Sequence, residues 1–300
     1  MSDDADNGAP ERRPGGVDRL WTPWRMRYVG GQAAEDGCLF CNRFAEADDV
    51  RSLILHRGER AFAMMNLFPY NTGHLMLLPN AHVATPEEAE PAALAEVAGL
   101  LAPVSRALRR VLRCDGFNVG MNVGAVAGAG VADHLHQHVV PRWEGDANFM
   151  PILASTMVLP ELIPVTYAKA RAELARESGA AAATLVVLDA DRRRVLAVGG
   201  DGGRRLPEVR PGGGEPVWRA AVRTATELTG APAEVVGWAG ERRVVPGERP
   251  ALTVAVAARA AVGDRARWLP LEAAMAGSDN GRDHRTVAAA LANLAPGDGG

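Results

Sequence analysis

Three of the seven histidines fall within five consecutive positions, as His134-Leu135-His136-Gln137-His138. Successive side chains of a β-strand point to opposite faces, so this spacing predicts that the three imidazoles share one face. Such a row is costly to bury without partners, and its members titrate near neutral pH. We therefore expect a strand that runs through the cluster to Arg142 and carries a chemical site on one side.

The segment before the histidines favours phosphate chemistry. It is rich in glycine over residues 124–130, and its backbone N–H groups could form a concave site for an anion. Such a loop is a weak indication alone, but three histidines in phase after it indicate a phosphate site that holds a nucleophile. Two other interpretations stay open. The histidines could be ordinary hydrogen-bonded or surface residues, or they could bind a metal, since His-x-His on a strand suits zinc.

Apolar periodicity predicts the other elements of the first half of the chain. Short apolar runs predict strands at residues 52–56, 61–65, 75–79 and 117–123. A stripe of Leu and Val with helical spacing runs from residue 94 to residue 112. Pro103 lies inside this helix and should kink it rather than end it.

The pattern restarts in the second half of the chain. A helical segment at residues 167–176 is followed, from Ala183 to Val198, by two β-rich runs around a polar turn, which is a hairpin signature. We place a domain boundary at residues 176–181. The polar first 18 residues and the glycine-rich residues 296–300 are expected to be disordered tails.

Composition excludes several classes of protein. A net charge of −3 over 300 residues argues against nucleic acid as the main partner. No apolar run approaches the ~20 residues that a bilayer requires, and residues 1–16 lack the apolar core of a secretory signal. Three cysteines are too few for a disulfide framework. We therefore expect a cytoplasmic protein without membrane or nucleic-acid partners.

Two of the cysteines have the spacing of metal ligands, as Cys38-Leu39-Phe40-Cys41. A Cys-x-x-Cys pair is typical of zinc sites, but two thiols do not complete one. Two reduced thiols without a metal remain the alternative.

The cluster resembles the signature of the histidine triad (HIT) family of nucleotide hydrolases and transferases. The resemblance covers roughly residues 19–175 and is greatest to the actinobacterial diadenosine tetraphosphate phosphorylases of that family. It is carried by the histidine segment 134–140 and by four further blocks, at residues 19–23, 66–75, 116–120 and 141–149.

The resemblance implies a role for each matching residue. His136 would be the nucleophile that attacks the α-phosphate of an adenine nucleotide and forms a nucleotidyl-histidine, while His134 and His138 would flank the phosphate. Asn66 would contact the ribose hydroxyls. The positions implied beside the phosphates are Asn122, Gly124, Gly128 and Gly130.

The resemblance also implies a structural zinc. Many relatives complete the Cys-x-x-Cys site with two histidines, which here correspond to His82 and to His134. Such a closed site would tether the N-terminal segment to the catalytic strand and would compete with any phosphate role of His134. Cys38, Cys41, His82 and His134 are therefore the candidate ligands.

Two residues depart from the family pattern. Gln137 stands where an apolar residue is usual, and we expect it to point away from the site. Gly130 stands where relatives often carry a Ser or Gln that hydrogen-bonds the leaving group, which puts the speed of reaction and the choice of acceptor in doubt.

Residues 182–295 resemble a degenerate Nudix domain. The retained residues of its signature are Glu215, Arg223 and Glu227. Thr224 and Leu228 replace two of the helix carboxylates, and a Nudix site needs several acids to hold a divalent metal against a pyrophosphate. We expect a catalytically silent domain.

These observations predict an α+β fold, with a HIT-type antiparallel sheet and long helix at residues 19–178 and a Nudix-like α/β sandwich at residues 182–295. The expected activity is cleavage of diadenosine polyphosphates, by phosphorolysis or hydrolysis, in a homodimer. No organic cofactor is expected, and any divalent metal at the phosphates would arrive with the nucleotide. The alternatives are a nucleotide-binding sensor built on two degenerate domains and a zinc-stabilised scaffold without a ligand.

Overall fold

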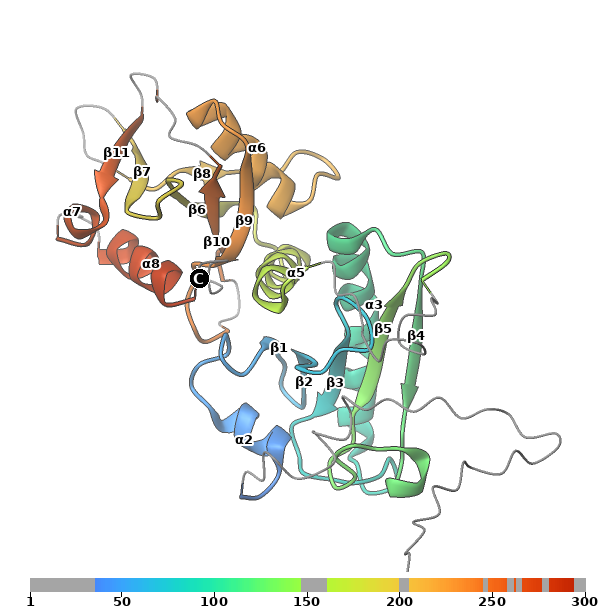
Figure 1. Ribbon diagram of the computed structural model, residues 1–300. Helices are drawn as coiled ribbons and strands as arrows, with labels where there is room; N and C mark the ends of the chain where they lie inside the picture. Colours follow the sequence, from blue (N-terminus) through green and yellow to red (C-terminus); the bar gives the residue numbers. More distant parts are fainter. Residues whose placement is uncertain are drawn as a thin grey trace, which may run out of the picture. The chain divides into compact units, whose positions relative to one another are not determined.

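The first half of the chain forms a five-stranded antiparallel sheet in the computed structural model (Figure 1). Its strand order is β1-β2-β3-β5-β4. The strands span Ile54–Arg57 (β1), Ala61–Met65 (β2), Leu75–Pro79 (β3), Gly116–Met121 (β4) and Gln137–Arg142 (β5). The structure describes residues 36–146, 161–199, 205–244, 248–257, 262, 266–276 and 281–293. The predicted tails, the block at residues 19–23 and the last three residues of the block at residues 141–149 lie outside these residues.

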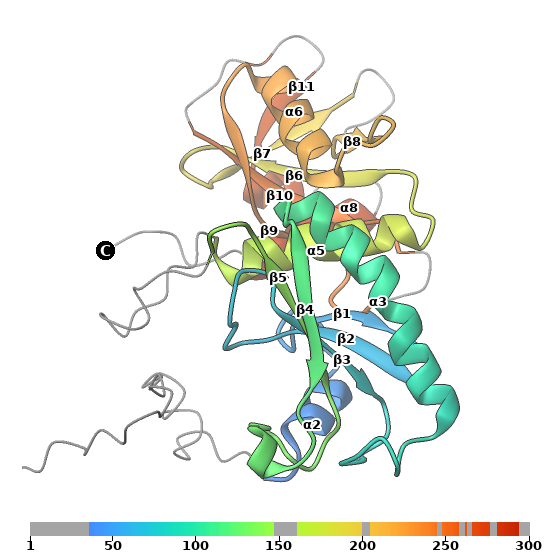
Figure 2. The ribbon, with the colours of Figure 1, turned by 90° about the vertical axis from the view of Figure 1, so that its right-hand side faces the viewer.

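The central strands β2 and β3 are buried along their whole length, so they carry apolar residues on both faces of the sheet. Leu75, Leu77 and Val139 belong to a core that includes the long helix α3 (Pro91–Leu112), which lies along the sheet in Figure 2. The opposite face presents Phe62, Met64, Met76 and Leu78 to Phe40 of the short helix α2 (Leu39–Ala45). In the β3–β5 register Met76 pairs with His138, so His138 lies on the α2 face.

Helix α3 continues through Pro103 and ends at Leu112, as the sequence predicts. By length and composition α3 could cross a membrane, so the expectation that no apolar run is long enough was wrong on length. One such helix is a weak indication, because core helices of globular proteins meet the same criterion. Here α3 contacts β2, β3 and β5 through its buried stripe.

The second half of the chain forms a mixed sheet. Its order is β11-β7-β6-β10-β9, and β8 pairs with β6. β6 and β10 run parallel, and the other pairs are antiparallel. The strands span Ala183–Leu188 (β6), Arg194–Val198 (β7), Glu208–Val209 (β8), Ala233–Trp238 (β9), Ala251–Val256 (β10) and Ala266–Pro270 (β11). β6 and β7 form the predicted hairpin.

Helices cover both faces of this second sheet. Leu185 and Val187 of β6 pack in the core that includes helix α6 (Val217–Thr229), whereas Val186 and Leu188 pack with helix α8 (Gly281–Ala292). A further short helix, α7 (Leu271–Ala276), contacts β11 and α8. Alternate side chains of one strand thus serve two layers, which makes this half an α/β sandwich.

Helix α5 (Ile163–Glu177) contacts elements of both halves. It packs against α3 and β1 on one side and against β9, β10 and α6 on the other. α5 ends within the predicted boundary at 176–181, but its packing makes it part of both cores.

Candidate catalytic site and metal centre

Only one of the three histidines, His138, lies within a strand of the sheet. β5 begins at Gln137, so the prediction of a strand through the whole cluster was wrong for His134 and His136. Pro79 ends the neighbouring strand and has no N–H to continue the ladder. The Leu135 N–H donates instead to the Val83 carbonyl, at 2.6 Å. His134 and His136 therefore precede β5 and lie beyond the end of the sheet.

The imidazole rings nevertheless stay in contact. The ring centroids of His136 and His138 lie 4.9 Å apart, with the planes at 81°. The Phe40 ring of α2 packs against the rings of His134 and His136, with centroid distances of 5.5 Å and 5.1 Å. His134 and His136 are only 1 % and 4 % exposed. The structure thus gathers the three rings in one cluster and leaves little of the middle ring open to solvent.

His136 has one ring nitrogen fixed and the other available. Its Nδ1 lies 2.8 Å from the backbone oxygen of His134. A carbonyl can only accept a hydrogen bond, so Nδ1 carries the proton and Nε2 holds the lone pair. Burial lowers the pKa of His136, and the bond to the carbonyl offsets part of that shift. A neutral imidazole with a free Nε2 is the form that can act as a nucleophile.

A fourth histidine, His74, fixes the tautomer of His138. The Tyr70 N–H donates to His74 Nδ1 at 3.0 Å, so the proton of a neutral His74 lies on Nε2. That nitrogen lies 3.0 Å from His138 Nδ1 and donates to it. A neutral His138 then carries its own proton on Nε2. The sequence predicted no catalytic or binding role for His74, although it lies in the 66–75 block.

Asn66 lies beside His74 at the end of β2. Its Nδ2 is 3.5 Å from His74 Nδ1, and its Oδ1 accepts the Phe68 N–H at 2.8 Å. The structure therefore places Asn66 next to the histidine cluster. Its implied contact with a ribose stays a prediction.

The glycine-rich loop joins β4 to β5. Met121 at the end of β4 pairs with Gln137, so Asn122 follows at the end of the sheet where His136 precedes β5. Gly124 and Gly128, with φ of 80° and 87°, flank a short 3₁₀ turn. A Cβ at either glycine would meet nothing within 4 Å, so glycine serves the backbone angle there rather than a close approach. Gly130 lies exposed in the same loop.

Gln137 points away from the cluster, as predicted. It pairs with Leu77 of β3, which packs in the α3 core, whereas His138 pairs with Met76 on the α2 face. A polar residue at this position therefore leaves the α2 face unchanged.

The four predicted zinc ligands converge. One ligand atom from each of Cys38, Cys41, His82 and His134 lies within 4.8 Å of every other. His134 Nδ1 is 3.4 Å from Cys38 Sγ and 3.6 Å from Cys41 Sγ, and His82 Nδ1 is 3.5 Å from Cys41 Sγ. Tetrahedral zinc with ordinary Zn–S and Zn–N bonds requires S···N edges of about 3.6 Å.

The chemistry of these donors also fits zinc. His134 Nε2 lies 3.1 Å from the Pro79 carbonyl, so its proton is there and the Nδ1 lone pair faces the thiols. Burial and the neighbouring Cys38 raise the pKa of Cys41 to about 11, and a divalent cation would reverse that preference. Both ring nitrogens of His134 are engaged by these contacts. This arrangement favours its metal role over a phosphate role.

A polar network fixes the other end of β5. Arg142 donates to Asp146 through Nε at 2.7 Å and through Nη2 at 2.5 Å. Asn71 Nδ2 donates to Asp146 Oδ2 at 3.0 Å. These bonds lower the pKa of Asp146 to about 2. The network ties the loop after β5 to the loop that carries His74.

Comparison with known proteins identifies the class of this chain. A family model described as the HIT domain matches residues 48–145. The AP-4-A phosphorylase of Mycobacterium tuberculosis is 38% identical over 169 residues, which cover 54% of this chain and 86% of that protein. The chain therefore belongs to the HIT family.

One further relative agrees with this assignment in sequence, and one solved structure is similar over about half of the chain. An uncharacterised HIT-like protein of Saccharolobus solfataricus is 30% identical over 113 residues, which cover 38% of this chain and 79% of that protein. A crystal structure of a Zn-bound histidine triad family protein from Mycobacterium smegmatis is 26% identical, with a TM-score of 0.39 over 48% of this chain and 97% of that chain.

Proposed function

We propose that this protein cleaves diadenosine polyphosphates, above all diadenosine tetraphosphate, through a nucleotide bound covalently to His136. The observation that carries the proposal is the hydrogen bond from His136 Nδ1 to the His134 carbonyl, which leaves Nε2 with a lone pair. The substrate class is supported by the 38% identity to an AP-4-A phosphorylase.

The first step forms one bond and breaks one. His136 Nε2 attacks the α-phosphorus, an N–P bond forms, and the P–O bond to the rest of the polyphosphate breaks. The tautomer of His138 supports a stabilising role, because its Nε2–H can donate a hydrogen bond to the departing oxygen, which leaves as the ATP anion without a proton transfer. With diadenosine tetraphosphate the leaving group is ATP. The backbone N–H groups of the loop at 124–130 would offset the charge on the phosphate oxygens.

The second step releases the nucleotide from His136 and regenerates the free enzyme. Inorganic phosphate attacks the same phosphorus, the N–P bond breaks, and ADP leaves, so the net reaction is phosphorolysis to ATP and ADP. Water as the acceptor would give AMP instead. The name of the M. tuberculosis relative supports phosphate as the acceptor.

A zinc ion bound by Cys38, Cys41, His82 and His134 would be structural in this proposal. With four protein ligands it has no open position for substrate, and it would link α2 to the segment that carries His136.

The test uses diadenosine tetraphosphate and two histidine variants. His136→Ala should abolish turnover while nucleotide binding persists, because the variant loses the nucleophile and keeps the fold around it. His56→Ala, on β1, is the matched control and should retain the parent rate. ATP plus ADP formed only with phosphate present would support phosphorolysis, and ATP plus AMP would support hydrolysis. A His136→Ala variant that cleaves at the parent rate would exclude the mechanism.

The alternative function, a nucleotide-binding sensor, is favoured by one observation in the second half. Arg223 pairs through Nε with Glu215 at 3.0 Å and through Nη1 with Glu227 at 3.1 Å. The two retained Nudix acids are thus already paired with one arginine, which suits a domain without magnesium chemistry. Tight nucleotide binding with neither product nor a covalent adduct would support the sensor.

The Nudix-like identity of residues 182–295 is likewise a proposal. It is supported by the mixed sheet between α6 and α8 and by the position of Glu215 and Arg223 around α6. Calorimetric titration with magnesium and a nucleoside diphosphate tests the Nudix-like identity. We expect no hydrolysis of the nucleotide by this half of the chain.

We further propose a cytoplasmic homodimer. All three cysteines are free thiols, which suits a reducing compartment. β4 is an edge strand of its sheet, with Asn118, Val119 and Gly120 exposed, and an unpaired edge can accept a strand from a second copy. Sedimentation equilibrium tests the dimer, and a monomer at all concentrations would exclude it.

A further inference from the structure

We propose that the loop after β9, residues 240–244, positions α2 and thereby His136, acting through the buried carboxylate of Asp49. The inference rests on the proposed function, because it concerns the residue assigned there as the nucleophile. It gives the second half of the chain a part in the reaction without a catalytic site of its own.

The Asp49 carboxylate joins the two halves of the chain. It is fully buried. Its Oδ2 accepts the Val244 N–H at 2.6 Å, and its Oδ1 accepts Nε and Nη2 of Arg57 at 2.9 and 2.6 Å. The Asp49 N–H donates to the Arg242 carbonyl at 2.8 Å. Since both oxygens have strong donors, the carboxylate is held in one orientation.

Arg57 carries this constraint from β1 to the end of α2. Its Nη1 donates to the Phe44 carbonyl at 2.7 Å and its Nη2 to the Glu46 carbonyl at 3.2 Å. The guanidinium also lies over the Phe44 ring, 4.6 Å from the centroid. The last carbonyls of a helix have no partners within the helix, and a cation there satisfies them and favours the helix dipole.

The other end of α2 contacts the reacting histidine. Phe40 is 3 % exposed and its ring lies 5.1 Å from that of His136. α2 has seven residues, too few to be stable alone, so its tilt depends on what holds its ends. A shift at Phe44 would therefore move Phe40 and change the packing around His136.

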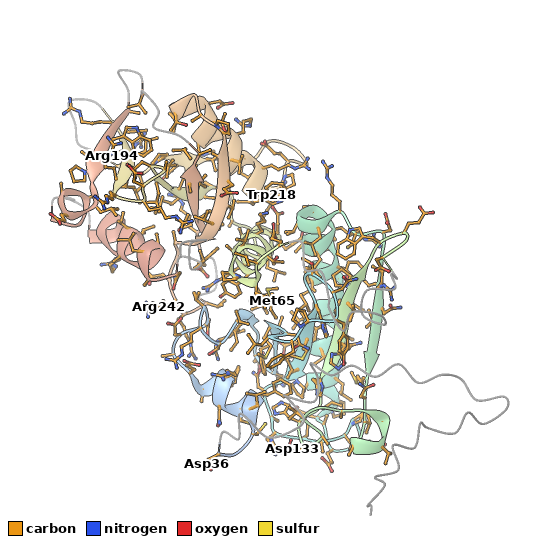
Figure 3. All side chains as sticks on the ribbon, in the orientation of Figure 1. Asp36, Met65, Asp133, Arg194, Trp218 and Arg242 are labelled. Atoms are coloured by element: carbon orange, nitrogen blue, oxygen red, sulfur yellow. The ribbon has the colours of Figure 1, made fainter. Side chains whose placement is uncertain are left out.

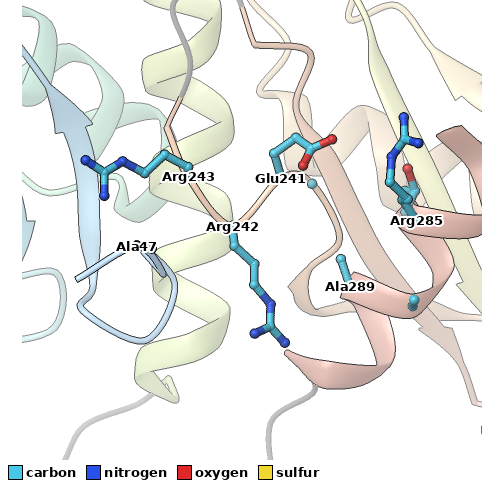
Figure 4. Close-up of a pocket in the computed structure, with 9 residues that line it drawn as sticks. Ala47, Glu241, Arg242, Arg243, Arg285 and Ala289 are labelled. Atoms are coloured by element: carbon cyan, nitrogen blue, oxygen red, sulfur yellow. The ribbon is translucent and has the colours of Figure 1, made fainter.

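The loop is held by Trp238 of β9 and Arg171 of α5, because the Glu241 carbonyl accepts Trp238 Nε1 at 3.1 Å and Arg171 Nη2 at 3.0 Å, and the loop in turn bonds residues 46–49. Arg243 Nη1 donates to the Glu46 carbonyl at 2.8 Å, and Arg242 pairs with Asp48 at 3.0 Å. On the α8 side the loop borders a cavity of about 460 Å³, with Arg285 on its wall. In Figure 4, Arg243 points toward the segment that holds Ala47, and the guanidinium groups of the three arginines do not converge.

The test is Asp49→Asn in the full chain, which keeps the shape but sets an amide N–H₂ or a neutral oxygen against the Arg57 and Val244 donors. We expect kcat on diadenosine tetraphosphate to fall about tenfold, the scale of lost orienting partners, while KM stays within about twofold. The imidazole NMR signals of His136 should shift in the free protein.

Asp189→Asn is the matched control. Asp189 is equally buried and accepts a hydrogen bond from Arg194 Nε at 2.7 Å, but it lies in the β6–β7 turn. Figure 3 labels Arg194 beside this turn and Arg242 in the loop after β9. We expect a comparable fall in the thermal midpoint with unchanged kcat and unchanged His136 signals. If both variants lose kcat equally, or if only KM changes, the positioning role is wrong.

A second variant tests the inference if Asp49→Asn does not fold. Arg57→Lys keeps the charge beside Asp49 but cannot reach both α2 carbonyls, so it should fold and show the same loss of kcat. Full kcat in this variant with unshifted His136 signals overturns the inference. If instead His136→Ala itself retains turnover, the proposed function fails, whatever the Asp49 result.

Discussion

At the scale of residues, the partner of one ring nitrogen decides what the other can do. His136 bonds a carbonyl through Nδ1, and His138 receives a proton from His74, which is set by the Tyr70 N–H. The sequence predicted that His134, His136 and His138 cluster, because their placement at alternate positions is visible in it. It could not predict these tautomers, because a carbonyl or an amide is contributed by every residue and its direction depends on the fold.

Replacing His74 with Phe tests the tautomer argument. Phe keeps the buried ring volume but removes the donor to His138 Nδ1, so His138 can hold its proton on either nitrogen. We expect kcat on diadenosine tetraphosphate to fall about 10- to 100-fold, the usual loss when an orienting partner is removed. His56→Phe, on β1, is the control and should leave kcat unchanged. Equal rates for both variants would show that His74 only fills space.

The Asp146 network predicts a pH dependence of stability. The folded pKa of about 2 lies below the ordinary 3.8, so the folded state binds fewer protons between these values. The stabilisation is complete above pH 3.8 and is lost as pH falls through about 2. Asp146→Asn should cost on the order of 1 kcal/mol at neutral pH, and less as pH falls through this window. Urea unfolding at several pH values measures it, and a pH-independent difference would contradict the assignment.

At the scale of elements, the apolar runs correctly predicted β2 and β3. The helical periodicity correctly predicted that α3 continues through Pro103. The predicted strand at 117–123 is β4, shortened to residues 116–121. The start of β5 was missed because it depends on a proline in a different strand, Pro79, which ends the ladder. Such a constraint is tertiary, so the alternation of His134, Leu135 and His136 could not reveal it.

The geometry of the four candidate ligands predicts that the short helix α2 depends on a bound zinc ion. Its first residue follows Cys38 and its third is Cys41, so zinc would hold its N-terminal end. We expect zinc to be detected in the purified protein by plasma mass spectrometry, and chelation to lower the thermal midpoint by roughly 5 °C or more. Cys41→Ser should lose the metal, whereas Cys114→Ser should keep it. A parent protein without zinc at full stability would contradict the metal centre.

At the scale of the whole molecule, α5 belongs to the core of each half, so the halves should unfold together. Arg171 of α5 is 1 % exposed and donates to Tyr167 Oη at 2.7 Å and to Glu248 at 3.0 Å. Its guanidinium also lies over the Trp238 ring. The sequence indicated two domains from the restart at Ala183, but it gave no sign that one helix serves both.

Arg171→Leu tests this coupling. It leaves the Glu248 carboxylate without its buried partner, so the free energy of unfolding should fall by about 3–5 kcal/mol. Arg171→Leu with Glu248→Leu should recover part of the loss, since it removes the Glu248 carboxylate as well. Denaturant unfolding followed by circular dichroism should show one transition in the parent. Two separated transitions in the parent would contradict a shared core.

The central claim is the covalent step on His136. Quenching the protein with diadenosine tetraphosphate in alkaline denaturant, where a histidine N–P bond survives, tests this step when phosphate is left out and the peptides are analysed by mass spectrometry. We expect an AMP adduct on the peptide that contains His136, and we expect it to be lost when phosphate is added before the quench. Rapid cleavage with no adduct on that peptide, or an adduct that persists in His136→Ala, would contradict it.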